Sequence, residues 1–251
     1  MKVVILGAGS VAAHITQALL ESAIDVGQIY NRTLEHAQAI AKPYNLSYTD
    51  KISEIQKADL YIIAVSDDSV TEVSYHIPFD DCLVVHTAGS LGIEALKGDY
   101  RKGVVYPLQN FTSGIGVRHE KVPYLIESLS DEDYQVLYKL FAKISEKVYR
   151  VNADQRLKMQ LAGVFVSSFM NLLYNVGEEL CTDADLPFSI LIPAIEETAM
   201  KVRDINPSKV YPLLALNNEE KTIEKHLELL KNKESISRLY QQITAEINKR
   251  K

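Results

Sequence analysis

The chain has 251 residues, of which 47% are hydrophobic and 24% are charged, and its formal net charge is −6. This is the composition of an ordinary globular protein, and a chain of this length can bury a core without disulfide staples. The two cysteines, Cys82 and Cys181, lie far apart and match no metal-ligand spacing, which is typical of a reducing compartment. The mildly acidic balance, with its one basic cluster at Lys249–Lys251, argues against a nucleic-acid surface.

No apolar run approaches the roughly 20 residues that a membrane-spanning helix needs. The longest candidate, residues 161–174, contains Ser167, Ser168 and Asn171. Glycines interrupt the apolar N-terminus and no small-residue cleavage site follows it, so we interpret it as a first strand and not as a signal peptide. We therefore expect a cytoplasmic protein that contacts neither membrane nor nucleic acid.

Residues 1–152 alternate short β-rich apolar runs with helical segments, which is the pattern of βαβ units and a parallel sheet. The expected strands are 2–6, 26–30, 60–65, 82–86, 103–106, 123–127 and 147–151. The expected helices between them are 11–22, 34–41, 69–75 and 131–144. Ser130 and Asp133 form a capping box for the last helix, and Asp67 or Asp68 can cap the helix after the third strand.

After Asn152 the strand pattern stops and the remainder reads as helix, which predicts one domain over 1–152 and a smaller helical domain over 153–251. A long first helix is expected over 154–180, because its apolar residues recur at three- and four-residue spacings. A second helix is expected over 187–202, with Asp185 as a plausible cap and Pro193 as a kink or a late start. Two further helices are expected over 219–231 and 235–249.

The strongest local motif lies between the first strand and the first helix and reads Gly7-Ala8-Gly9-Ser10-Val11-Ala12. This is the G-x-G-x-x-A pattern in its required strand-turn-helix context. Gly7 permits the tight turn, Gly9 lets the backbone approach a pyrophosphate, and Ala12 allows close packing of helix on strand. The helix N-terminus adds N–H donors for phosphate oxygens. The motif predicts a dinucleotide-binding Rossmann domain, which is an α/β fold with a doubly wound, mainly parallel sheet.

The end of the second strand indicates which dinucleotide binds. An NAD site has an acidic side chain there to accept hydrogen bonds from the ribose hydroxyls. This chain instead has Asn31-Arg32-Thr33. Arg32 can pair bidentately with a 2′-phosphate, while Asn31 and Thr33 donate hydrogen bonds. We therefore expect NADP(H), the alternative being that Arg32 is a solvated loop charge.

A third cofactor segment follows the strand over 60–65. Ligands in open α/β sheets bind outside the carboxyl ends of the strands. Val65, Ser66 and Asp67 are therefore expected along the ribose and nicotinamide side of the cofactor. The alternative for Asp67 is a role as helix cap only.

Several segments in this order and spacing resemble one family, and they lie at residues 7–11, 31–33, 58–60, 64–68, 85–90 and 106–111. The most specific are the His-Thr-x-Gly segment at 86–89 and the Pro-Leu-Gln-x-Phe segment at 107–111. The chain is similar to a bacterial family of Rossmann-like proteins with a C-terminal helical domain of unknown function. That family is distantly related to pyrroline-5-carboxylate reductase and deazaflavin-dependent NADP reductases. The resemblance implies NADP-linked oxidoreductase chemistry.

The chain departs from the family pattern at positions that concern catalysis more than cofactor binding. Tyr106 stands where the family often has His, and Gln160 and Ser168 stand where it favours His and Asn. The family's Thr-Gly-Pro-Ala-x-Arg-x-Asp segment is only weakly matched here, by residues 212–219, which include Asn217. These departures motivate a second hypothesis, that of a catalytically silent NADP-binding sensor or interaction protein.

The candidate catalytic residues are His86, Tyr106, Gln109 and Ser168. His86 ends a strand and could donate a hydrogen bond or a proton to a carbonyl, or it could be a neutral histidine bonded to backbone. Tyr106 and Gln109 could orient a substrate, or serve in packing. Ser168 could line a pocket between the domains, or bond to Asn171.

The first hypothesis is thus hydride transfer between NADP(H) and a small carbonyl or imine substrate held between the domains. No histidine has carboxylates or cysteines at metal-ligand spacing, so no metal is expected. The resemblance also suggests that the wide apolar face of residues 154–180 packs in a homodimer.

Overall fold

The computed structural model describes residues 1–112, 116–207 and 220–249. The chain divides into two compact units, Met1–Ser168 and Phe169–Lys251, which are described in turn. The expected segment 212–219, with Asn217, lies outside the described residues, as do Arg250 and Lys251 of the terminal basic cluster.

Within the described residues of the first unit, eight strands form one sheet. They are β1 (Lys2–Leu6), β2 (Asp25–Tyr30), β3 (Ser47–Thr49), β4 (Leu60–Ile63), β5 (Leu83–His86), β6 (Arg101–Pro107), β7 (Tyr124–Ser128) and β8 (Val148–Arg150). Their order is β3-β2-β1-β4-β5-β6-β7-β8, and only the β6–β7 pair is antiparallel. The order runs outward from β1 in both directions, which confirms the doubly wound, mainly parallel sheet.

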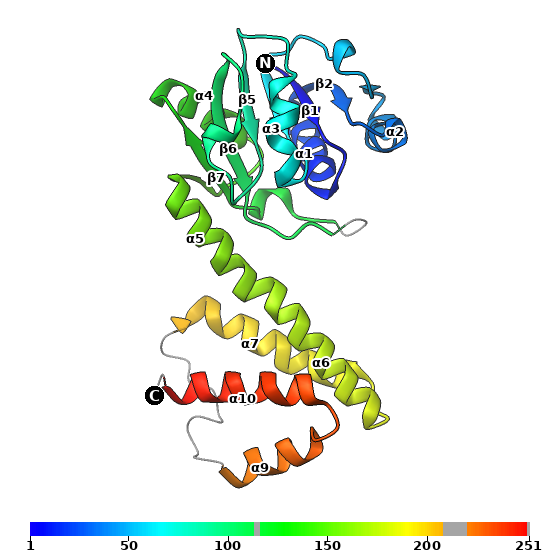
Figure 1. The fold of residues 1–251 in the computed structure, drawn as a ribbon, viewed down its shortest axis with the longest axis vertical. Coiled ribbons are helices and arrows are strands. Elements are labelled where there is room, and N and C mark those ends of the chain that lie inside the picture. Colours follow the sequence, from blue (N-terminus) through cyan, green and yellow to red (C-terminus); the bar gives the residue numbers. More distant parts are fainter. Residues whose placement is uncertain (113–115, 208–219, 250–251) are drawn as a thin grey trace. The chain divides into compact units, whose positions relative to one another are not determined.

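Four helices flank the sheet, namely α1 (Ser10–Glu21), α2 (Leu34–Ala41), α3 (Asp67–Tyr75) and α4 (Asp131–Phe141). Successive side chains of a strand point to opposite faces. Val3 and Ile5 of β1 accordingly join a core cluster with residues of α1, α2 and α4, whereas Val4 and Leu6 join a second cluster with residues of α3. Figure 1 shows these helices on the two faces of the sheet. Both faces are therefore buried, as the continuous apolar runs predict.

Helix α4 begins as predicted. Ser130 Oγ accepts a hydrogen bond from the Asp133 amide at 3.1 Å and donates one to the Asp133 carboxylate at 2.9 Å. The same carboxylate accepts from Arg101 Nη1 at 2.6 Å. In α3 the predicted caps were wrong, because Ser66 occupies the N-cap position and Asp67 and Asp68 lie in the first turn. There their charges favour the positive end of the helix dipole.

The helical half starts at α5 (Ala153–Gly163), whose N-terminus has a capping box between Asn152 and Gln155. A π-helical segment (Val164–Ser168) and α6 (Phe169–Asp183) follow directly. The helix predicted over 154–180 is thus confirmed, but with a π segment inside it that apolar spacing does not reveal.

In the second unit, a 3-10 turn (Phe188–Leu191) precedes α7 (Ile192–Asp204), and α9 (Glu220–Leu229) and α10 (Glu234–Lys249) come later. Pro193 lies in the first turn of α7, which confirms the late start. The predicted cap at Asp185 was wrong, since this residue has φ +54° in the preceding turn and Leu191 is the N-cap of α7.

Over the described residues, none of the helices combines the length and the apolar character that crossing a bilayer would require.

Candidate functional site

A cavity of about 420 Å³ opens at the carboxyl ends of β1, β2 and β4, and we call it the glycine-turn cavity. It brings together ten of the eleven predicted cofactor residues, namely Gly7, Ala8, Gly9, Ser10, Val11, Asn31, Arg32, Val65, Ser66 and Asp67. The loop after β5 completes one wall with Thr87, Ala88 and Gly89, next to Tyr106 and Gln160. Thr33 does not line the cavity. It is the N-cap residue of α2, and its carbonyl accepts a hydrogen bond from Asn31 Nδ2 at 3.0 Å.

The two glycines of the turn are required for different reasons. Gly7 has φ +126°, and a Cβ there would lie 2.0 Å from the Ala64 carbonyl oxygen, so a larger residue would be strained and would clash. A Cβ at Gly9 would meet no described protein atom within 4 Å and would point into open space. Gly9 is also the N-cap residue of α1, where an anion is favoured. The space that glycine leaves at position 9 therefore fits the pyrophosphate of a dinucleotide.

Arg32 lies exposed at the rim, directly after β2. Within the part of the chain that the structure describes, no ion pair engages its guanidinium. The backbone N–H of the preceding residue, Asn31, donates a hydrogen bond to the Thr49 carbonyl at 3.2 Å. The strand end is therefore fixed, while a cationic side chain remains accessible to a phosphate.

Asp67 lines the cavity from the first turn of α3 and accepts a hydrogen bond from Ser90 Oγ. Its neighbour Ser66 donates to Ser69 Oγ at 3.1 Å. Burial, and then the negative charge of Asp67, raise the pKa of Tyr106 above its ordinary value. The phenol of Tyr106 is therefore a hydrogen-bond donor throughout the neutral pH range.

A second cavity of about 510 Å³ shares Tyr106 and Gln160 with the glycine-turn cavity, and we call it the adjoining cavity. Gln109, Asn110 and Ser167 also line it. Ser168 does not line either cavity. Its hydroxyl is 3.4 Å from Asn110 Nδ2, which also donates to Ser167 Oγ.

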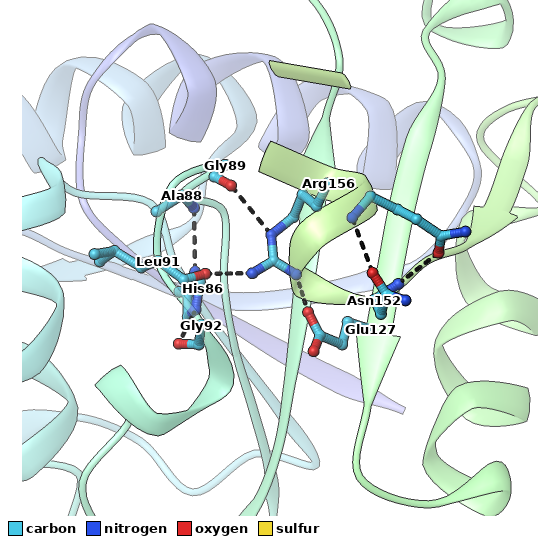
Figure 2. A network of polar contacts seen from close by, with 9 residues as sticks. His86, Ala88, Gly89, Leu91, Gly92, Glu127, Asn152 and Arg156 are labelled. Carbon is cyan, nitrogen blue, oxygen red and sulfur yellow. Dashed lines mark hydrogen bonds and ion pairs between the residues drawn. The ribbon is translucent and has the colours of Figure 1, made fainter. Parts of the chain in front are cut away.

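His86 lies at the end of β5 and is fully buried, and it lines neither cavity. Its Nδ1 accepts a hydrogen bond from the Ala88 amide at 3.2 Å, and its Nε2 lies 3.1 Å from the Gly92 carbonyl oxygen (Figure 2). Burial lowers the pKa of His86 from 6.5 to about 4. The ring is therefore neutral at pH 7, with the Nε2 proton donated to Gly92, and it holds the loop behind the cavity wall.

Sequence reasoning did not find Arg156, which is the largest fully buried side chain of the described residues. Its Nε donates to the Gly89 carbonyl at 3.3 Å, and its two terminal nitrogens donate to the Leu91 carbonyl and the Glu127 carboxylate (Figure 2). A signal was available, because Arg156 and Gln160 are four residues apart and so share one face of α5. The apolar periodicity of this helix indicates its apolar positions and says nothing about Arg156.

In the described residues there is no group of three or more histidine, cysteine, aspartate or glutamate side chains that could hold a metal ion.

Comparisons with known proteins agree with this geometry. The family profile of a domain of unknown function, DUF2520, matches residues 122–247, and the profile of shikimate / quinate 5-dehydrogenase matches residues 1–73. A glutamyl-tRNA reductase of Methanococcus maripaludis is 26% identical over 151 residues, which are 57% of this chain and 39% of that protein. The chain therefore spans well under half the length of this curated relative.

Solved structures match over nearly the whole chain. A Bacteroides fragilis protein, provisionally named an NADP oxidoreductase, has a TM-score of 0.92 and 32% identity, with 99% of this chain and 98% of that chain covered. A pyrroline carboxylate reductase of Plasmodium falciparum with NADP bound has a TM-score of 0.63 and 13% identity, with 100% and 98% covered. At that identity the second likeness concerns the fold alone.

Proposed function

This chain belongs to the DUF2520 family, and we propose that it is an oxidoreductase that binds NADP(H) and reduces a small carbonyl or imine compound or catalyses the reverse oxidation. The observation that carries the proposal is the glycine-turn cavity, which gathers ten predicted cofactor residues at the carboxyl edge of a doubly wound sheet. That edge is where open α/β sheets bind their ligands. The relative with 32% identity, provisionally named an NADP oxidoreductase, supports both the cofactor and the class of reaction.

The cofactor-holding residues divide into two groups along the cavity. Gly7–Val11 would hold the pyrophosphate, and Arg32 would hold the 2′-phosphate that distinguishes NADP(H) from NAD(H). Val65, Ser66 and Asp67, together with the wall over Thr87–Gly89, would lie along the ribose and nicotinamide half. The accessible guanidinium at the rim favours the phosphorylated cofactor.

The substrate would meet the cofactor where the two cavities share Tyr106 and Gln160. NADPH, when bound, supplies the hydride. The protonated phenol of Tyr106 would donate a hydrogen bond to the carbonyl oxygen or imine nitrogen, and Gln109 and Gln160 would orient the compound through their amides. His86 would not contact the substrate, and would instead hold the loop that forms the cavity wall through its bonds to Ala88 and Gly92.

A catalytically silent NADP-binding sensor or interaction protein is the second candidate. It is favoured by the departures from the resembled pattern at Gln160 and Ser168, where the resemblance implies histidine and asparagine. Gln160 cannot carry a proton at neutral pH as a histidine can.

Thermal melting with NADPH, with NADH and without ligand tests the cofactor. A ligand at about 100 times its dissociation constant stabilises by roughly 2.7 kcal/mol, or about 5–10 °C for a chain of this size. We expect this shift with NADPH alone and its loss in Arg32→Ala. Arg118→Ala, which removes another exposed arginine of the same unit away from the glycine-turn cavity, should keep it. No shift with either cofactor would overturn the proposal.

A screen for NADPH oxidation with small ketones, aldehydes, keto acids and cyclic imines then separates the two candidates. Turnover with any compound, reduced in Tyr106→Phe, excludes the silent protein. NADPH binding without turnover across the whole screen favours the sensor.

A further inference from the structure

The loop between β5 and β6 forms one wall of the glycine-turn cavity, although residues 87–92 contain no helix or strand. Backbone without regular structure needs partners outside itself to stay in one conformation. The Thr87 amide donates to the Ile63 carbonyl at 3.1 Å. Four further backbone groups are bonded by side chains, and these groups belong to Ala88, Gly89, Leu91 and Gly92. His86 binds the outer two and Arg156 binds the inner two (Figure 2).

Arg156 reaches this loop from the first turns of α5, which follows β8 in the chain. Figure 2 shows the guanidinium between the loop carbonyls on one side and Glu127 on the other. Glu127 belongs to β7 and is largely covered, so the two opposite charges meet with little access to water. The arginine therefore ties the loop, strand β7 and helix α5 together at one point.

A buried ion pair of this kind contributes little net stability, because the two charges lose their hydration. Its advantage here is geometric. Arginine has a planar fork of five N–H donors, which can serve three acceptors on two chain segments at once. A lysine in the same place could neutralise Glu127 but could not hold both carbonyls in the same directions.

The position of Gly89 decides the shape of the wall. A Cβ at this residue would lie 2.9 Å from both Tyr106 and Gln160. The carbonyl that Arg156 holds thus belongs to the residue against which the two side chains shared by both cavities pack. Gln160 lies one helical turn after Arg156, so a single helix face sets both the loop and the side chain that touches it.

We propose that Arg156 is a positioning residue that fixes the nicotinamide-side wall of the cavity, and with it Tyr106 and Gln160, while touching neither cofactor nor substrate. The inference rests on the proposed function. Arg156 would fix the conformation of residues 87–91. The adenosine end of the site, at Arg32, would not depend on Arg156.

Binding of two different ligands distinguishes effects at the two ends of the site. NADPH contacts both, whereas adenosine 2′,5′-bisphosphate contains only the half that Arg32 and the glycine turn would hold. In Arg156→Lys we expect the dissociation constant for NADPH to rise by roughly tenfold, the effect of losing one charge-assisted hydrogen bond. The dissociation constant for adenosine 2′,5′-bisphosphate should stay the same. The fluorescence emission of bound NADPH, which reports the surroundings of the nicotinamide, should move toward that of free NADPH.

Arg101→Lys is the matched control. Arg101 also forms a part-buried ion pair on this sheet, with Asp133, but it starts β6 whereas Tyr106 lies near the other end of that strand. It should change neither dissociation constant. The double variant Arg156→Met/Glu127→Leu removes both charges together and so avoids leaving one buried alone. It should reproduce the selective loss of NADPH affinity.

Each outcome is decisive. Equal loss of both ligands in Arg156→Lys would show a general structural role and overturn the inference, as would unchanged affinity for both. If the unmodified protein binds neither NADPH nor adenosine 2′,5′-bisphosphate, the proposed function itself fails.

Discussion

The backbone of Gly89 lies directly against the phenol ring of Tyr106, so that a Cβ atom at position 89 would be 2.9 Å from Tyr106 Cζ. Gln160 Cδ lies at the same distance from that position. The loop after β5, the end of β6 and the second turn of α5 thus meet at one glycine, and the cavity wall has no room for a methyl group there.

Gly89→Ala should therefore impair NADPH binding while the protein stays folded. Tyr106 and Gln160 are side chains and can move aside, so we expect a melting temperature close to that of the unmodified protein. The NADPH dissociation constant should rise by about tenfold, which corresponds to roughly 1.4 kcal/mol. Gly177→Ala is the control, because its Cβ would make contacts of 3.5 and 3.6 Å, which are ordinary van der Waals distances. Unchanged NADPH affinity in Gly89→Ala would contradict the prediction.

Alanine substitutions at the two glycines of the first turn should have different effects, on stability at Gly7 and on NADPH binding at Gly9. Gly7→Ala places a side chain at φ +126° and 2.0 Å from the Ala64 carbonyl oxygen, so it should lower stability by about 2 kcal/mol or more. Gly9→Ala extends into open space, so the melting temperature without ligand should not fall. The stabilisation by NADPH should nevertheless disappear, because the methyl group occupies the place of the pyrophosphate. Melting curves of both variants with and without NADPH check this, and a Gly9→Ala protein that is still stabilised would count against the site.

The pH dependence of the free energy of unfolding should reveal the lowered pKa of His86. Its pKa is about 4 in the folded protein, chiefly through burial, and 6.5 is its ordinary value. As the pH falls from about 6.5 to about 4, the unfolded chain takes up a proton that the folded protein does not. The free energy of unfolding should therefore fall by up to about 3 kcal/mol in this window.

The contribution of His86 can be isolated by difference. His86→Gln keeps a donor and an acceptor but does not titrate, so urea unfolding of this variant should show a flatter dependence between pH 4 and 6.5. His76→Gln, which replaces an exposed histidine, should behave like the unmodified protein. Parallel curves for His86→Gln and the unmodified protein would contradict the assignment.

The apolar residues along 157–180 should mediate self-association. Leu157, Leu161, Phe165, Leu172 and Leu180 are all exposed in the single chain. Large exposed apolar side chains that recur along a helix mark an interaction site. We expect the mass of a dimer in light scattering and a smaller mass for Leu172→Lys. Leu129→Lys, at an exposed leucine before α4, should leave the mass unchanged. A monomer at working concentration would exclude the predicted homodimer.

Much of the fold could be predicted because the strands are short apolar runs with both faces buried. All seven predicted strands are confirmed, with ends that differ by up to two residues. Strand β3 (Ser47–Thr49) was missed, since three residues of which one is exposed carry no pattern of their own. Its place in the sheet comes from pairing with β2.

The candidate site was predictable only where it is local in sequence. The glycine turn and the segment after β2 are contiguous motifs, so the residues that line the cavity there could be named beforehand. The contacts of Arg156 could not be predicted beyond its place on the same helix face as Gln160, because its partners Gly89, Leu91 and Glu127 are far away in the chain and only the fold brings them together. The assignment of cofactor binding to residues 1–152 stays a prediction, and Gln160 already reaches the cavity from beyond that boundary.

The pairing of Arg156 with Glu127 also bears on how sequences of this family can diverge. A relative that lost one of the two charges would bury the other unpaired, which costs several kcal/mol, so neither change is easily inherited alone. Positions 127 and 156 should therefore covary across homologues, with both charges retained or both replaced. Glycine at position 89 should persist in lineages that keep tyrosine at 106 and glutamine at 160, and a larger residue there should be accompanied by smaller partners.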